Sequence, residues 1–226
     1  MSREIIYRDL GRIAYDEAWA YQEKLFDGIV ESKKNSVAGD VPNHLLFCEH
    51  PHVYTLGKSG SEHNLLLNSQ ALMEKGVTFF RTNRGGDITY HGPGQIVGYP
   101  ILDLEAFGMG IRRYIEILEE AVIILLEGSG ISAGRLPGAS GVWLDADIPF
   151  KARKICAIGV RSSRFVTMHG FAFNVNTSLE YFNYINPCGI TDKGVTSMQK
   201  ELGREQDIEE VKARLRDTLL QQFIRS

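Results

Sequence analysis

Helical and strand-like patterns follow one another along this chain without the strict alternation that builds a doubly wound parallel sheet. The clearest pattern covers 111–127, where apolar side chains at helical spacing form one stripe and Gly128 follows. Similar amphipathic patterns begin at Tyr15 and cover about 207–224. The strand-like runs between 131 and 176 are separated by gaps of hairpin length, which favours antiparallel pairing there. This order favours an α+β fold, or an α/β fold with a mixed sheet, over a doubly wound nucleotide-binding fold.

Short runs rich in β-branched and aromatic residues predict the strands. A short helix is expected at 69–75, where Gly76 ends it. The chain shows no repeat, low-complexity tract or linker, so residues 1–226 are expected to form a single domain, whose helical C-terminal end could be a small subdomain. The strands are expected at 4–8, 44–48, 54–56, 77–81, 95–102, 131–135, 141–144, 154–161 and 165–176.

The composition excludes several classes of protein. A chain of 226 residues can bury a core without disulfides or metal ions. Its net charge of −3 lacks the basic excess of a nucleic-acid-binding protein, so no nucleic-acid partner is expected. The longest aliphatic run, 121–126, is far shorter than the roughly 20 residues that cross a bilayer, and charged residues occupy the N-terminus, so no membrane association is expected. The 3 cysteines are too few for a disulfide framework, which predicts a cytoplasmic protein. The sequence carries no signal for the oligomeric state, so a monomer is the default expectation.

Glycines are concentrated between residues 84 and 99. The segment RGGDITYHGPGQ at 84–95 lies between two expected strands and combines exposed backbone with polar side chains such as Arg84 and His91. Such a segment is either a decorated hairpin connection or a ligand-binding loop, and the density of glycines favours the second interpretation. The spacing matches neither GxGxxG nor GxxxxGK[ST], and no strand-to-helix junction follows, so a nucleotide phosphate loop is rejected.

Cys188 lies between a proline and a glycine, which indicates a rigid turn rather than a core strand. Such a cysteine is either a small buried hydrophobic residue or a nucleophile, and the local sequence leaves both interpretations open. A nucleophilic thiol needs a nearby base or cation, because its ordinary pKa is about 8.5. Lys154, His91 and His169 are the candidates for that role. Lys154 opens an apolar strand-like run, so it is either a solvated edge residue or a desolvated acid–base group.

The other two cysteines have simpler surroundings. Cys48 falls within an expected strand and is expected in the core. Cys156 is a rival nucleophile because it shares a strand face with Lys154, although its apolar neighbours favour a packed or site-lining position. The run Glu-His-Pro-His at 49–52 offers metal ligands, but Pro51 breaks regular geometry and no second cluster has zinc-like spacing. No metal site is therefore expected.

These segments together resemble the lipoyl(octanoyl) transferases. The signature is RGGDITYHGPGQ at 84–95 followed by YPILDL at 99–104. The blocks occur in the order typical of that family and cover roughly residues 1–220. Cys156 departs from the pattern, since the family commonly has a small apolar residue there, and its role stays open. Further blocks that agree are EHPHVYTLGK at 49–58, KICAIGVR at 154–161, FVTMHGFAFNV at 165–175 and PCGI at 187–190.

The resemblance implies the biotin/lipoate protein ligase-like fold, with a mixed, largely antiparallel sheet flanked by helices. It implies transfer of an octanoyl group from octanoyl-acyl carrier protein to a lysine of lipoyl domains, namely those of 2-oxoacid dehydrogenase complexes and the glycine cleavage H protein, without a cofactor. Cys188 would carry the acyl group as a thioester, and Lys154 would be its acid–base partner. The substrate site would include Arg84, Gly85, Gly86, Asp87, Ile88, Thr89, Tyr90, His91, Ala157, Ile158, Gly159, Gly170, Phe171 and Ala172.

Three other functions compete with this interpretation. An ATP-dependent lipoate or biotin protein ligase of the same fold needs a lysine but no cysteine nucleophile, so Cys188 argues against it. A non-catalytic module that binds acyl carriers would not need both Cys188 and Lys154. A cysteine hydrolase would need a histidine partner such as His91 or His169.

Overall fold

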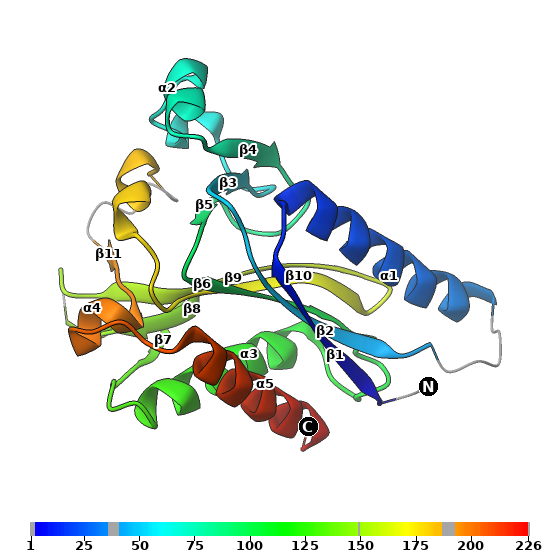
Figure 1. Cartoon of the computed structure of the whole chain (residues 1–226). Coiled ribbons are helices and arrows are strands. Elements are labelled where there is room, and N and C mark those ends of the chain that lie inside the picture. Colours follow the sequence, from blue (N-terminus) through cyan, green and yellow to red (C-terminus); the bar gives the residue numbers. More distant parts are fainter. Residues whose placement is uncertain (1–2, 36–40, 149, 187–192, 226) are drawn as a thin grey trace.

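The computed structural model describes residues 3–35, 41–148, 150–186 and 193–225. Within these residues, eight strands form one main sheet (Figure 1): β1 (Ile5–Arg12), β2 (Asn43–Glu49), β6 (Gln95–Ile101), β7 (Gly134–Leu136), β8 (Ala139–Leu144), β9 (Arg153–Ser163), β10 (Val166–Asn174) and β11 (Gly194–Val195). Their order is β1-β2-β6-β10-β9-β8-β7, with β11 beside β9. β1 is parallel to β2 and β11 to β9, and the other neighbouring strands are antiparallel. The predicted mixed, largely antiparallel sheet is therefore confirmed.

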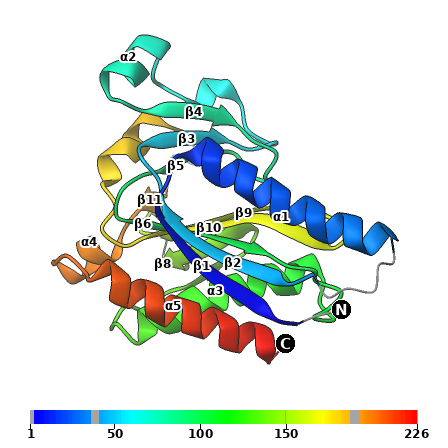
Figure 2. The same ribbon diagram turned by 45° about the vertical axis from the view of Figure 1, so that its right-hand side comes forward.

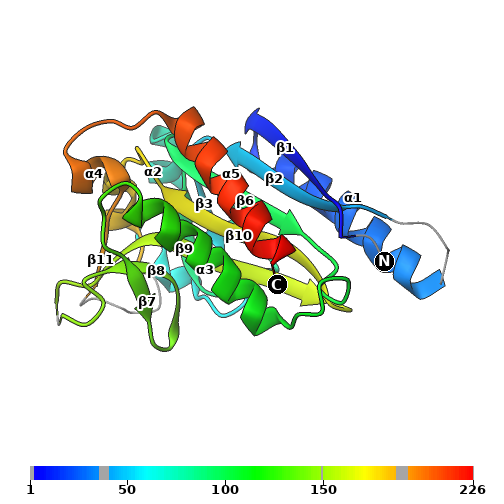
Figure 3. The ribbon, with the colours of Figure 1, turned by 90° about the horizontal axis from the view of Figure 1, so that it is seen from below.

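Helices cover both faces of the main sheet (Figures 1 and 3). α1 (Tyr15–Asn35) lies on one face, and α3 (Ile111–Glu127) and α5 (Ile208–Ile224) lie side by side on the other. Ala18 and Phe26 of α1 pack in a cluster with residues of β2, β6 and β10. Side chains of α3 and α5 share a larger cluster with the opposite face of the sheet. No helix in the described part of the chain is long and apolar enough to span a membrane.

Local sequence features set where α3 ends and where α5 begins. α3 has the bounds that its apolar stripe predicts, with Leu118 and Val122 fully buried and the Gly128 N–H closing the last turn on the helix backbone. Burial of such a side chain contributes about 1.5–3 kcal/mol. At α5, the Asp207 carboxylate accepts hydrogen bonds from the N–H groups of Glu209 and Glu210, as an N-cap residue does.

A second, three-stranded sheet stands above the main sheet on the side of α1 (Figure 2). It consists of β4 (Thr78–Arg81), β3 (Val53–Leu56) and β5 (Ile88–His91) in that order, with β3 parallel to β4 and antiparallel to β5. Beside it lie α2 (Ser69–Glu74) and the 3-10 helices η1 (Glu62–Asn64) and η2 (Leu179–Tyr184). Tyr54, Tyr90 and Ile185 pack in a separate apolar cluster that joins this sheet to η2.

Several elements differ from the prediction. The prediction of a connection without a strand over 84–95 is wrong. Ile88–His91 form β5, because their β-branched and aromatic side chains favour a strand that pairs with β3. β7 lies later than the run expected at 131–135, and Ile131 packs in the core instead. The sequence also did not predict η2, β11 or α4 (Met198–Leu202), which are short and carry little periodicity.

Candidate active site

A cavity of about 1050 Å³ is lined by residues of both sheets, of η2 and of β11. It brings together segments that are far apart in the sequence. Tyr90 is the one described residue of the predicted site that does not line it, because its ring is buried and stacks on Tyr181 with ring centres 4.9 Å apart. The predicted residues that do line it are Arg84, Gly85, Gly86, Asp87, Ile88, Thr89, His91, Lys154, Ala157, Ile158, Gly159, Gly170, Phe171 and Ala172.

The wall formed by β9 and β10 carries small residues. Gly159 lies opposite Gly170, and Ala157 lies opposite Ala172. A Cβ atom at Gly159 would lie 2.9 Å from the Gly85 carbonyl oxygen and 3.2 Å from Cδ of Arg84. The glycine at this position therefore lets the Arg84–Gly85 backbone rest directly on β9.

Arg84 is almost completely buried at this wall, and β3 fixes its guanidinium group. Nη2 donates to the Thr55 carbonyl oxygen at 2.6 Å and to Thr55 Oγ1 at 3.0 Å. Nη1 donates to the Gly85 carbonyl oxygen at 3.0 Å, and the Gly85 N–H donates to the Val160 carbonyl oxygen at 2.9 Å. The positive charge of Arg84 is thus held in one position by both sheets.

The two histidines at the cavity are neutral. Nδ1 of His91 lies 2.9 Å from Gln95 Oε1, and burial lowers the pKa of His91 well below its usual value. Nε2 of His169 lies 2.6 Å from Asn83 Oδ1, and burial, with the Arg84 charge, lowers the pKa of His169 to about 3. Neither imidazole can therefore supply a positive charge to a thiol at neutral pH, and a group with so low a pKa is a weak base.

Lys154 lies on β9 and lines the same cavity. It is flanked by strands on both sides, since its register partners are Trp143 of β8 and Val195 of β11. Its Nζ lies 4.6 Å from the centre of the Trp143 ring. Lys154 is partly buried, and the strands on both sides argue against a position at a sheet edge.

Cys188 lies outside the described residues. The chain on either side of its segment is nevertheless well fixed at the cavity. The Asn186 N–H donates to the Asn64 carbonyl oxygen at 2.8 Å, and the Gly194 N–H donates to the Ala152 carbonyl oxygen at 2.9 Å. Asn186, Lys193, Gly194 and Val195 all line the cavity.

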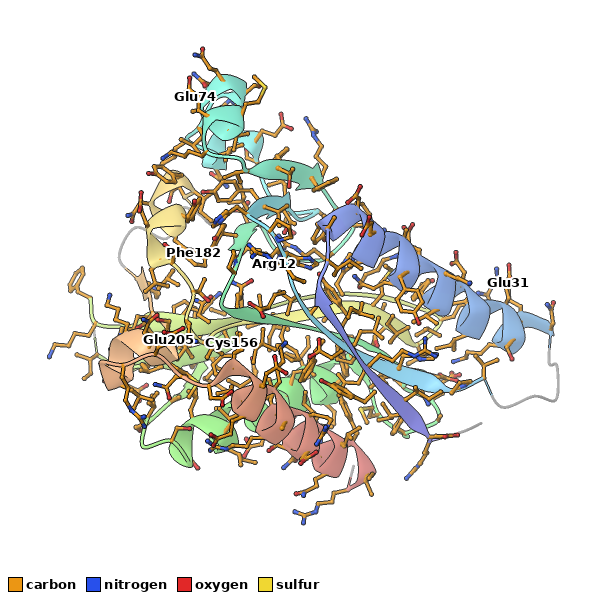
Figure 4. The ribbon with its side chains drawn as sticks, in the orientation of Figure 1. Arg12, Glu31, Glu74, Cys156, Phe182 and Glu205 are labelled. Carbon is orange, nitrogen blue, oxygen red and sulfur yellow. The ribbon has the colours of Figure 1, made fainter. Side chains whose placement is uncertain are left out.

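The remaining two cysteines are core residues. Cys48 is fully buried, as predicted. Cys156 is also fully buried in the cluster formed with α3, and Figure 4 shows it in the interior of the molecule. Burial raises the pKa of both thiols far above the usual range. Cys156 is not among the cavity-lining residues, which argues against it as the rival nucleophile.

The histidines of the segment 49–52 have structural partners. Nδ1 of His50 lies 2.8 Å from the Ile13 carbonyl oxygen, and Nε2 lies 2.7 Å from the Tyr99 hydroxyl. Burial lowers the pKa of His50 to about 4. His52 is hydrogen-bonded to the Tyr90 hydroxyl at 2.7 Å. Among the residues that the structure describes, no group of three or more histidine, cysteine or acidic side chains could hold a metal ion.

Sequence reasoning missed several polar residues of the site. Gln95 Nε2 donates to Asn174 Oδ1 at 2.9 Å, and Asn174 Nδ2 donates to the Thr196 carbonyl oxygen at 3.0 Å. Gln95 and Asn174 line the cavity and connect it to the chain that follows β11. Both lie within blocks that carry the resemblance, which was the available signal. Trp143 lies in none of those blocks.

Comparison with known proteins places these features in context. Residues 14–220 match the family described as "Lipoyl protein ligase A/B catalytic domain". An octanoyltransferase of Parabacteroides distasonis is 55% identical over 217 residues, which cover 96% of this chain and 97% of that protein. An octanoyltransferase of Flavobacterium johnsoniae is 58% identical over 220 residues, which cover 95% of this chain and 94% of that protein.

Solved structures share the fold at low sequence identity. A bipartite lipoate protein ligase from Thermoplasma acidophilum, studied with its E2 lipoyl domain, has a TM-score of 0.69 at 17% identity, covering 98% of this chain and 84% of that chain. A lipoate-protein ligase A bound with ATP has a TM-score of 0.65 at 18% identity, covering 99% of this chain and 86% of that chain. These similarities confirm the predicted biotin/lipoate protein ligase-like fold.

Proposed function

The chain belongs to the lipoyl protein ligase A/B catalytic domain family and is an octanoyltransferase of protein lipoylation, and we propose that it works through a thioester on Cys188. The donor is octanoyl-acyl carrier protein. The acceptor is a lysine of a lipoyl domain, in 2-oxoacid dehydrogenase complexes and in the glycine cleavage H protein. The enzyme acts as a monomeric, single-domain protein in the cytoplasm and needs no cofactor.

The observation that carries this proposal is that both flanks of the Cys188 segment border the cavity that contains Lys154. Asn186, two residues before Cys188 in the sequence, lines the cavity on one flank. On the other flank, Val195 lies opposite Lys154 in the parallel pairing of β11 with β9. The positions of Asn186 and Val195 support the proposal that the Cys188 thiol and the Lys154 amine act in the same cavity.

The Lys154 ammonium group is the proposed activator of the thiol. At an ordinary pKa of about 8.5, only about 3% of a thiol is ionised at pH 7. Lowering that pKa to 7 requires about 2 kcal/mol, which a nearby positive charge supplies. His91 and His169 are neutral and cannot supply it.

The reaction then proceeds in two balanced half-reactions. In the first, the Cys188 thiolate attacks the thioester carbonyl carbon of the donor, and the carrier thiolate leaves and takes a proton from Lys154. In the second, the neutral amine of the acceptor lysine attacks the Cys188 thioester, and an amide bond forms. The Cys188 thiolate leaves, and the proton lost by the acceptor amine returns to Lys154. The kinetics are therefore expected to be ping-pong.

The rest of the cavity supports acyl binding. Its volume of about 1050 Å³ is at the upper end of the range for small-molecule sites, so it has room for an acyl chain and an incoming amine. The small residues of β9 and β10 and the ring of Phe171 provide an apolar wall. Each buried methylene of the chain contributes about 0.8 kcal/mol, and burial shields the thioester from water.

The test is intact-mass analysis and peptide mapping after incubation with octanoyl-acyl carrier protein. Wild type, Cys188→Ala and the matched control Cys156→Ala are compared. The expected result is one octanoyl adduct on the Cys188 peptide in wild type and control, absent from Cys188→Ala, and discharged by a lipoyl domain. An adduct on Cys156 would contradict the proposed nucleophile. Folded protein that takes up no octanoyl group, but forms AMP from ATP and octanoate, would indicate a ligase instead.

A further inference from the structure

Trp143 of β8 lies directly opposite Lys154 of β9. Side chains opposite one another in an antiparallel pair lie on the same face, with Cβ atoms about 5 Å apart. The Lys154 Nζ lies 4.6 Å from the centre of the indole ring, within the range of a cation–π contact. Both residues line the cavity.

A β-bulge creates this pairing. Val142 lies opposite Cys156, so a regular ladder would place Trp143 opposite Ile155. The register instead shifts between Val142 and Trp143, and Trp143 meets Lys154. Bulges next to active sites re-aim side chains in this way.

Other contacts fix the bulge and the ring. The Gly141 N–H donates to the buried Glu119 carboxylate of α3 at 2.9 Å, and Gly141 has a positive φ of 118°, which favours glycine. A side chain at Gly141 would also collide with the Cys156 carbonyl oxygen. The Trp143 Nε1–H donates to the Ala139 carbonyl oxygen at 3.2 Å, and the side chain is almost completely buried. The ring is therefore rigid, whereas a lysine side chain has a flexible four-carbon stem.

We propose that Trp143 is a positioning residue of Lys154, which holds its ammonium group at the cavity wall where the acyl group is transferred. In this role Trp143 acts through Lys154 and not on the reacting atoms. The role rests on the proposed function of Lys154 as the acid–base group, but the contact between ring and amine can be tested without the reaction.

Removing the π face has two expected effects. Loss of positioning slows formation of the acyl-enzyme by roughly 3- to 30-fold, the range that a cation–π contact supports. The charged amine also loses stabilisation, so the alkaline limb of the rate profile is expected to move to lower pH. Cys156 interacts electrostatically with both Lys154 and Glu119, and Lys193 and Lys200 line the same cavity; the variants leave all of these groups in place.

The kinetic experiment compares Trp143→Phe and Trp143→Leu with wild type. Trp143→Leu is expected to show the slower acylation and the shifted alkaline limb, with the KM for the donor within about twofold of wild type. Trp143→Phe keeps a ring and is expected to recover most of the rate. Equal loss in both variants, or a loss confined to KM, overturns the positioning role.

The second experiment needs no catalysis. The chain has 2 tryptophans, so Trp143 is the sole one in a Trp19→Phe background. Its fluorescence is expected to change as Lys154 loses its proton, and this transition is expected to be absent from Trp19→Phe/Lys154→Met. Ionisation of tyrosines occurs in both proteins and cancels. Identical titrations overturn the contact. Wild-type protein that takes up no octanoyl group overturns the proposed function instead, and the titration still decides the contact.

Discussion

Gly159 on β9 is the point at which the Arg84–Gly85 backbone rests on the main sheet. We expect Gly159→Ala to destabilise the protein and to impair octanoyl transfer. The added Cβ would lie 2.9 Å from the Gly85 carbonyl oxygen and 3.2 Å from Arg84 Cδ. The first distance is shorter than real contacts allow, and its partner is backbone, so the loop must move.

The size of the effect follows from that geometry. Extra methyl groups in well-packed regions cost about 1–3 kcal/mol. For a chain of this length, the midpoint of thermal unfolding falls by roughly 2–4 °C per kcal/mol, which gives a decrease of roughly 2–12 °C. Displacement of the loop also moves Arg84, whose hydrogen bonds to Thr55 fix its guanidinium group to β3 of the second sheet.

Gly134→Ala is the matched control. Gly134 also lies in a strand of the main sheet, but a Cβ there meets nothing within 4 Å, and its φ is not positive. That variant is expected to be as stable as wild type or slightly more stable, because alanine restricts the unfolded chain. The assays are thermal unfolding and the rate of octanoyl transfer to a lipoyl domain. A Gly159→Ala protein as stable and active as Gly134→Ala would refute the close-approach argument.

Three further changes test other parts of the structure. Asp207→Ala removes the N-cap of α5 and is expected to lower the free energy of unfolding in urea by about 1 kcal/mol; an unchanged midpoint would contradict the cap. Burial lowers the pKa of His50 to about 4. As pH drops from about 6.5 to about 4, the His50 imidazole therefore stays neutral in the folded protein but takes up a proton in the unfolded chain, and the free energy of unfolding falls. His50→Gln is expected to flatten part of that fall, and an unaltered pH dependence would contradict it. Glu201→Gln weakens the paired hydrogen bonds that Arg153 donates to Glu201, and it is expected to lower the free energy of unfolding in urea by about 1–3 kcal/mol. An unchanged free energy of unfolding would contradict a stabilising role for this pair.

Long periodic segments made much of the fold predictable. α3 has the predicted bounds because a single apolar stripe ends at a glycine. β9 and β10 appeared as long β-rich runs separated by a short turn, and they pair as a hairpin. β11 could not be predicted, because two residues carry no pattern and their position depends on the free edge that β9 offers beyond the end of β10.

Tyr90, the described residue of the predicted site that does not line the cavity, shows why the site was harder to predict than the fold. Thr89 and His91 line the cavity, whereas Tyr90 between them points into the cluster with Tyr54. This alternation is the ordinary consequence of a strand, but flanking glycines concealed β5 in the sequence. The cavity position of Trp143 was equally hidden, because it depends on a one-residue register shift that no local pattern encodes.

β9 is the element that unites the two ends of the site. Gly159 supports the Arg84 loop, and Lys154 meets Trp143 and β11 five residues earlier on the same strand. Five residues of a strand correspond to about 17 Å, so the cavity wall extends well beyond the reacting group. The small residues of this strand form the wall between Lys154 and the Arg84 loop. Since the two ends are farther apart than directly coupled residues usually are, the effects of Gly159→Ala and Trp143→Leu on transfer should be additive. A strong departure from additivity would mean that the bulge at Trp143 and the loop at Arg84 move together.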